Sequence, residues 1–156
     1  MKQKELSITL REMACSQPTP LCKEWTEAWK DDTDIDGLLD KYISGIDFAI
    51  KNNYPPLDFC RENFNRDDLH RHNIYLDEYI SIGDASSGTW VFVGNCEGEI
   101  TFKDFSVGTL YLRHNSRIKV VTKDMAKVFI SLYDESEVDV EQLEYSTAKV
   151  YDRHRK

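Results

Sequence analysis

A five-residue motif recurs at intervals near ten along the C-terminal third of the chain, from about Asn95 to Asp152. Each copy consists of a small residue, any residue, an aliphatic residue, any residue, and an aliphatic or aromatic residue. Five full copies and a weaker sixth begin at Gly98, Gly108, Ser116, Ala126, Ser136 and Ala148. Alternation with a period of two is typical of β-strands, so each copy predicts a short strand with its small and aliphatic residues on one side. The sixth copy departs from the motif at Asp152, which suggests an end cap.

Ten residues do not complete a typical coil, so we expect two strands to form each coil of a two-sided β-solenoid. Alternate copies would then stack, with coils of about 18 to 22 residues. The predicted stacks are Ile100 over Ile118 over Val138 on one side, and Leu110 over Val128 over Val150 on the other.

The outward residues are consistent with this arrangement, because stacked parallel strands place equivalent side chains on neighbouring rungs. One predicted side carries the ladders Glu99, Arg117, Glu137 and Thr101, Lys119, Asp139, in which opposite charges meet. The other side carries Tyr111, Phe129 and Tyr151 as an aromatic stack.

An antiparallel β-meander is the alternative, since its strands also need short turns and alternating faces. Tight hairpins favour Asn-Gly or Asp-Gly dipeptides, and neither occurs among Asn115-Ser116, Asp124-Met125 and Asp134-Glu135. We therefore favour the solenoid.

The segments 124–128 and 134–138 resemble the short repeats of bacterial β-solenoid proteins, in which Asp or Asn and a small residue precede a valine. The resemblance covers about a third of the chain, and the spacing around Arg113-His114-Asn115 departs from a strict repeat. It implies a bacterial or phage-related protein with a structural or interaction role, because such repeats share no catalytic residue set.

The N-terminal half has helical periodicity. A helix begun at Glu5 is broken by Gln17-Pro18-Thr19-Pro20, and further helices are predicted over 21–30, 37–52 and 57–64. From Asn73 the period changes to that of strands, with one strand predicted over Thr89–Val93. The fold class is therefore α+β, with a helical segment 1–72 and a β-repeat segment 73–156 packed as one compact unit.

Charge and composition limit the partners and the compartment that we expect for the protein. The net charge of -8 disfavours duplex nucleic acid as the main partner, because binding phosphates requires clustered Lys and Arg. No stretch approaches the roughly 20 apolar residues of a membrane span, and the start of the chain lacks the apolar core of a signal peptide. The four cysteines include no Cys-x-x-Cys pair, which favours free thiols and a cytoplasmic location.

The best candidate for a partner-binding site is the predicted aromatic side with its basic flanks. Its residues are Tyr111, Arg113, Lys127, Phe129, Lys149, Tyr151 and Arg153. Aromatic and arginine side chains are enriched at protein interfaces, and the same chemistry could stack single-stranded bases or sugar rings. Alternatively, the aromatic stack could stabilise the coils themselves or receive the apolar stripes of the helices.

No catalytic, metal or cofactor site is predicted. The sequence has neither a Gly-x-Ser-x-Gly elbow nor a phosphate loop, and His70 and His72 near Asp67 and Asp68 lack the spacing of a defined metal site. We expect a non-catalytic interaction or assembly module, acting through a protein partner or self-association. The alternative is a hydrolase of carbohydrate or nucleic acid that uses carboxylates with His70, His72 or His114 near the junction of the two halves.

Overall fold

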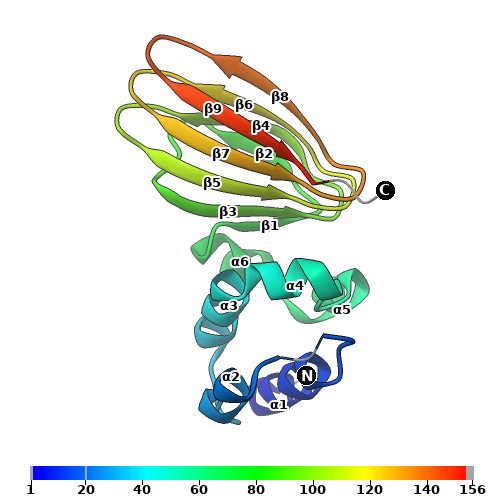
Figure 1. Cartoon of the computed structure of the whole chain (residues 1–156). Helices are drawn as coiled ribbons and strands as arrows, with labels where there is room; N and C mark the ends of the chain where they lie inside the picture. The colour runs from blue at the N-terminus through cyan, green and yellow to red at the C-terminus, as the bar shows by residue number, and fades with distance from the viewer. Residues whose placement is uncertain (1, 20, 154–156) are drawn as a thin grey trace. The chain divides into compact units, whose positions relative to one another are not determined.

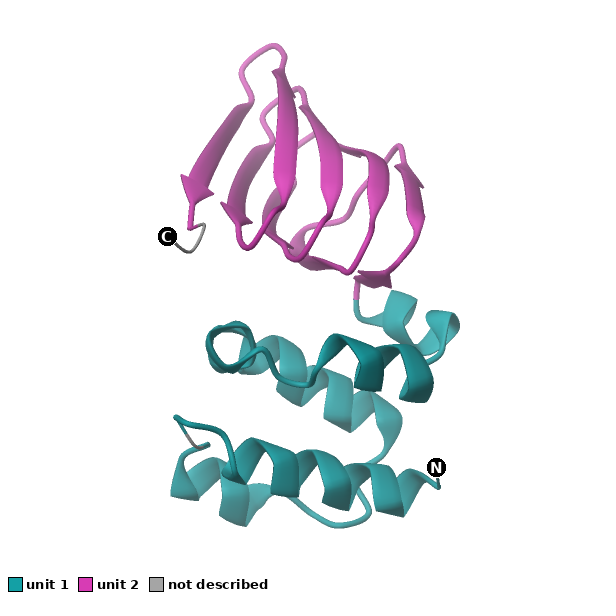
Figure 2. Cartoon of the chain, turned by 90° about the vertical axis from the view of Figure 1, so that its right-hand side faces the viewer, with its two compact units in different colours: residues 1–72 teal, residues 73–156 magenta. Residues whose placement is uncertain are grey.

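The computed structural model describes residues 2–19 and 21–153 of the chain. The chain divides into two compact units, residues 1–72 and residues 73–156 (Figure 2). The first unit is helical and the second is built from strands, which confirms the α+β class and the order of the two parts.

Over its described residues, 2–19 and 21–72, unit 1 has six helices. They are α1 (Gln3–Cys15), α2 (Lys23–Ala28), α3 (Ile35–Ser44), α4 (Ile46–Asn52), α5 (Leu57–Asn63) and α6 (Arg66–Arg71). The single helix predicted over 37–52 is in fact two, separated at Gly45, a residue type with low helix propensity. α3 begins two residues before the predicted start, and the Asp34 side chain caps it by accepting from the Gly37 N–H at 2.7 Å.

Buried polar groups in unit 1 are paired across its core. The Trp29 indole N–H donates to the Ser7 hydroxyl at 3.0 Å, and the Tyr54 hydroxyl donates to the Leu10 carbonyl at 2.8 Å. Burial raises the pKa of Tyr54 well above its ordinary value, so the phenol stays a neutral donor. The apolar core around them contains Leu6, Leu10, Ala14, Trp29, Leu38, Ala49 and Tyr54.

Unit 2 is a parallel β-solenoid with two sheets (Figure 1). Its strands are β1 (Ile74–Leu76), β2 (Tyr79–Ile82), β3 (Gly88–Val93), β4 (Glu97–Phe102), β5 (Val107–Leu112), β6 (Arg117–Thr122), β7 (Lys127–Leu132), β8 (Glu137–Gln142) and β9 (Thr147–Asp152). The odd-numbered strands form one sheet in the order β1-β3-β5-β7-β9, and the even-numbered strands form the other in the order β2-β4-β6-β8. All neighbouring strands pair in parallel, so the solenoid prediction is confirmed and the antiparallel meander is wrong.

The register of the coils differs from the predicted one. Arg117 pairs with Glu97 in the preceding coil and with Glu137 in the following one, so one coil takes 20 residues. The observed stacks are Ile100, Val120, Val140 in the even sheet and Leu110, Ile130, Val150 in the odd sheet. The predicted pairings of Ile100 with Ile118, of Leu110 with Val128 and of Val128 with Val150 are therefore wrong by two residues, whereas the predicted pairing of Ile118 with Val138 is confirmed.

The corners of the solenoid explain this register. Residues with positive φ recur every ten positions, at Asp104, His114, Asp124, Asp134 and Glu144. A small residue follows each of them two positions later, at Ser106, Ser116, Ala126, Ser136 and Ser146. The predicted copies that began at Gly98, Gly108 and Ala148 were thus placed two residues too late, and the spacing around His114 is regular after all.

Corner side chains also bind the neighbouring coil. The Asp124 carboxylate accepts from the Asp104 N–H at 2.9 Å, and the Asp134 carboxylate accepts from the His114 N–H at 3.1 Å. The bond from the Asp104 N–H lowers the pKa of Asp124. Left-handed backbone is tolerated best by Gly and by Asn, Asp and His. Both the left-handed backbone and the hydrogen bond to the neighbouring coil therefore favour short polar residues at the corners.

The solenoid interior is apolar in its middle coils. Phe92, Phe102, Ile100, Leu110 and Ile130 are each fully buried. The last described strand is different, because Val150 in β9 is 42% exposed. The sixth copy of the motif therefore forms a complete strand but does not close the last coil as the predicted end cap would.

Candidate binding face

The outer surface of the odd-numbered sheet carries most of the aromatic and basic residues singled out in the sequence. The ladders here are Thr109, Phe129, Lys149 and Tyr111, Ser131, Tyr151. Tyr111, Phe129 and Tyr151 thus belong to two neighbouring ladders, and the single aromatic stack predicted from the sequence is wrong. The cause is the two-residue error in register.

The correct register still gathers the rings into one group. Ser131 has Tyr111 and Tyr151 on its two neighbouring strands, and Phe129 and Tyr133 lie two residues away on its own side of the chain. We call these four rings, Tyr111, Phe129, Tyr133 and Tyr151, the aromatic cluster. The rings of Tyr111 and Tyr133 stack with centroids 6.4 Å apart and an interplanar angle of 18°.

The aromatic cluster is partly accessible. Phe129 is 39% exposed and the three tyrosines are half-buried, whereas Ser131 between them is only 8% exposed. Sequence reasoning missed Tyr133 and Ser131. The ten-residue spacing of the corner residues gives a coil of 20 residues, and this spacing would have placed both residues beside Tyr111.

Basic side chains border the aromatic cluster. Lys127, Lys149 and Arg153 are exposed, and Lys149 Nζ and the Arg153 guanidinium each lie 5.2 Å from the Tyr151 ring centroid. Such cation–π contacts are worth about 0.5–1 kcal/mol at exposed sites and hold the ring in place. Arg113 differs from the prediction, because it is 2% exposed and offers no accessible surface for a partner.

The two outer faces of the solenoid differ in charge. The outward positions of β3, β5, β7 and β9, with the residue that follows the last three strands, contain no carboxylate. Their cations are the exposed Lys127, Lys149 and Arg153 and the buried Arg113. The outward positions of the even-numbered sheet include Glu97, Glu99, Glu137, Asp139 and Glu141 against Arg117 and Lys119. An overall acidic chain therefore has one basic, aromatic face.

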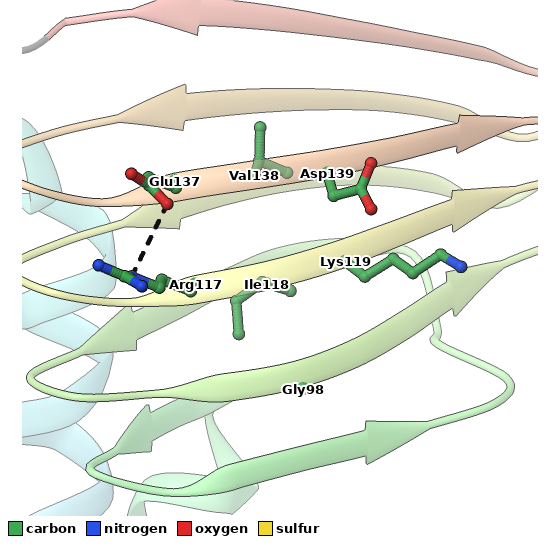
Figure 3. Close-up of a pocket in the computed structure, with 7 residues that line it drawn as sticks. All are labelled: Gly98, Arg117, Ile118, Lys119, Glu137, Val138 and Asp139. Carbon is green, nitrogen blue, oxygen red and sulfur yellow. Dashed lines mark ion pairs between the residues drawn. The ribbon is translucent and has the colours of Figure 1, made fainter.

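Figure 3 shows part of the even-numbered face, a shallow hollow over Gly98 with charged side chains along its walls. Arg117 Nε lies 3.7 Å from a Glu137 carboxylate oxygen. The ladders here are Glu97, Arg117, Glu137 and Glu99, Lys119, Asp139, so opposite charges alternate as predicted, although the ladder members from β4 are shifted by two residues. Opposite charges are therefore neighbours along each ladder, although carboxylates outnumber cations on this face.

Gly98 is fixed by backbone packing. It has a φ of +133°, and a Cβ at this position would lie 1.9 Å from the Ile80 carbonyl oxygen. The close approach of β2 to β4 therefore requires glycine here.

Two of the histidines considered for catalysis, His72 and His114, contact groups of the protein itself. His72 Nε2 lies 2.8 Å from Asp36 and His72 Nδ1 lies 3.1 Å from Asp40, while His114 Nδ1 accepts from the Gly94 N–H at 3.0 Å. The hydrogen bonds from His72 and then Arg71 lower the pKa of Asp36. His70 and His72 belong to unit 1 and His114 to unit 2.

Within residues 2–19 and 21–153, no group of three or more His, Cys, Asp or Glu side chains is arranged to hold a metal ion. None of the helices over the same ranges has the length and apolarity needed to cross a membrane.

The fold and this face define the second unit as a β-solenoid with one aromatic, basic outer sheet and with coils that take 20 residues from β3 onward. Comparison of the chain with models of protein families, with curated proteins and with solved structures finds no significant match.

Proposed function

We propose that this protein is a non-catalytic interaction or assembly module that binds an acidic protein surface through the outer face of its odd-numbered sheet. The observation that carries the proposal is the aromatic cluster around Ser131, bordered by Lys127, Lys149 and Arg153 with no outward carboxylate on the strands. The chain as a whole has a net charge of -8, so the composition alone does not account for a basic face.

The chemistry of the face suits a protein partner. Tyrosine and phenylalanine give a large apolar contact at a small cost in side-chain entropy, because each ring has only two side-chain torsions. Lys149 and Arg153 at the border would attract carboxylates and speed the encounter. Four rings with three exposed cations match the usual composition of an interface, in which apolar anchors lie within a polar rim.

Other partners and activities draw less support. The hydrolase hypothesis needs a histidine available to substrate, and both ring nitrogens of His72 lie within 3.1 Å of carboxylates. The three exposed cations of the face are few for a duplex-binding surface, which requires many phosphate contacts. A cytoplasmic setting, and the bacterial or phage-related origin suggested by the repeats, belong to the same proposal, and the four free cysteines are compatible with a reducing compartment.

Capture of partners from the native lysate tests the proposal. We expect Tyr111→Ser combined with Phe129→Ser to reduce recovery of the principal partner at least about tenfold, because interface aromatics commonly contribute more than 1 kcal/mol each. Partner identity and amount would be measured by quantitative mass spectrometry against the unmodified protein.

The matched control is Glu99→Ser combined with Asp139→Ser, two exposed outward residues of the other sheet. This control should recover the same partner in unchanged amount. Equal recovery by the aromatic variant, with its β circular dichroism intact, would rule out the aromatic cluster as the binding surface.

A further inference from the structure

The last coil of the solenoid, formed by β8 and β9, is open on one side. β8 ends the even-numbered sheet and β9 ends the odd-numbered sheet, so each has one edge without a neighbouring strand in the described chain. Val150 is 42% exposed, whereas Ile130, its equivalent one coil earlier, is fully buried. Leu143 and Tyr145, in the turn between the two strands, are 40% and 84% exposed. The interior apolar layer therefore meets solvent at this end.

The two edges have opposite charge. The outward residues of β8 are Glu137, Asp139 and Glu141, all exposed and acidic. β9 and the residue after it carry Lys149 and Arg153 on the outward side, with Tyr151 between them. An acidic edge and a basic edge thus lie on the same open coil.

We propose that two copies of this chain associate open end to open end, with β8 of each subunit pairing antiparallel to β9 of the other. A two-fold axis parallel to the strands places the even-numbered sheet of one subunit over the odd-numbered sheet of the other. The acidic β8 edge of each subunit therefore meets the basic β9 edge of its partner. Both sheets then continue from one subunit into the next, and the exposed apolar layer is covered. This self-association goes beyond the aromatic-face partner proposed above and does not depend on it.

The possible registers agree with the charges. Inward residues stay inward only if odd-numbered residues of β8 face odd-numbered residues of β9. In one such register Asp139 faces Lys149 of the partner subunit. In the next such register, Glu137 faces Arg153 of the partner subunit, and Glu141 faces Lys149 of the partner subunit. In both, a valine of β8 lies against Val150 of the partner subunit.

The alternative two-fold pairing, β8 against β8, would oppose three carboxylates with three carboxylates. Like charges placed opposite one another destabilise a strand pair, so the acidic edge selects against that arrangement. The Ala148 N–H on the edge of β9 is occupied in the single chain by the Gln142 side-chain oxygen at 3.0 Å. In the dimer Gln142 gives way to a backbone carbonyl of the partner subunit's β8.

Sedimentation of the 156-residue protein across concentration tests this inference. We expect a monomer–dimer equilibrium that weakens as salt rises from about 0.05 to about 0.5 M, since surface charges are screened over that range. Lys149→Glu should raise the dimer dissociation constant at least about tenfold, because a two-fold interface counts each substitution twice. Lys127→Glu is the matched control, the same change on β7, which is paired on both sides.

A charge exchange completes the design. Asp139→Lys with Glu141→Lys should weaken the dimer as Lys149→Glu does. The variant that combines all three substitutions should recover most of the lost affinity, because opposite charges face one another again. A protein that stays monomeric at all concentrations, a dimer that Lys149→Glu and Lys127→Glu affect equally, or an open-ended polymer would each overturn the inference. Tyr111→Ser with Phe129→Ser should leave the dimer intact, so failure of partner capture and failure of dimerisation remain distinguishable.

Discussion

Neighbouring residues along β7 have opposite surroundings. Val128 and Ile130 are 1% and 0% exposed, whereas Phe129 between them is 39% exposed. Because strand side chains alternate between two faces, moving a charge by one residue along the strand decides whether it meets solvent or the apolar interior. The two-residue repeat of the sequence therefore decides which side chains of unit 2 face inward.

This alternation gives a prediction at the residue scale. Val128→Asp should remove more than about 3 kcal/mol of unfolding free energy, because an unpaired carboxylate would enter the apolar interior. Lys127→Asp, one residue away and exposed, should change the free energy by less than about 0.5 kcal/mol. Urea unfolding followed by β circular dichroism measures both. Equal stability of the two variants would contradict the assigned faces of β7.

At the scale of elements, the sequence predicted strands, parallel stacking and alternating charges, but it misplaced the register. Gly98, Gly108 and Ala148 are as small as the true corner residues, so a search for small residues could not separate them. Hydrophobic alternation repeats every two residues, and a two-residue shift therefore preserves every inward and outward assignment. The decisive signal was the ten-residue spacing of Asp104, His114, Asp124, Asp134 and Glu144.

The aromatic cluster was predictable only in part for the same reason. The outward orientation of Tyr111, Phe129 and Tyr151 depends on parity alone, whereas their neighbours depend on register. The burial of Arg113 had no sequence signal, since arginine is usually exposed. Division of the helix predicted over 37–52 depended on Gly45, which by itself only lowers helix propensity.

The corners support a second prediction. Asp134 has a φ of +54° and its carboxylate accepts from the His114 N–H. Asp134→Asn should keep the unfolding free energy within about 0.5 kcal/mol, because asparagine tolerates this backbone and retains an acceptor.

Asp134→Val should cost about 1–3 kcal/mol from backbone strain and the lost acceptor, and Asp134→Gly should fall between the two. The same urea titration gives the order of the three variants. A valine variant as stable as the asparagine variant would show that this corner is not left-handed.

At the scale of the whole molecule, net charge conceals an uneven distribution. The chain carries 28 acidic and 20 basic side chains, yet the outward strand positions of the odd-numbered sheet contain cations and no carboxylate. The even-numbered sheet carries ladders of alternating charge in which carboxylates outnumber cations. One face thus has the composition of a binding surface, and the other that of a solvated one.

The most direct test of this account is photo-crosslinking in native cells from one position on each face. A photoreactive phenylalanine analogue replaces Phe129 in one protein and Lys119 in a second. Because the aromatic cluster is the proposed interface, position 129 should yield a discrete adduct with one protein partner, and position 119 should yield little or none. Adducts from position 119 alone, or none from position 129, would contradict the central claim that this face binds a partner.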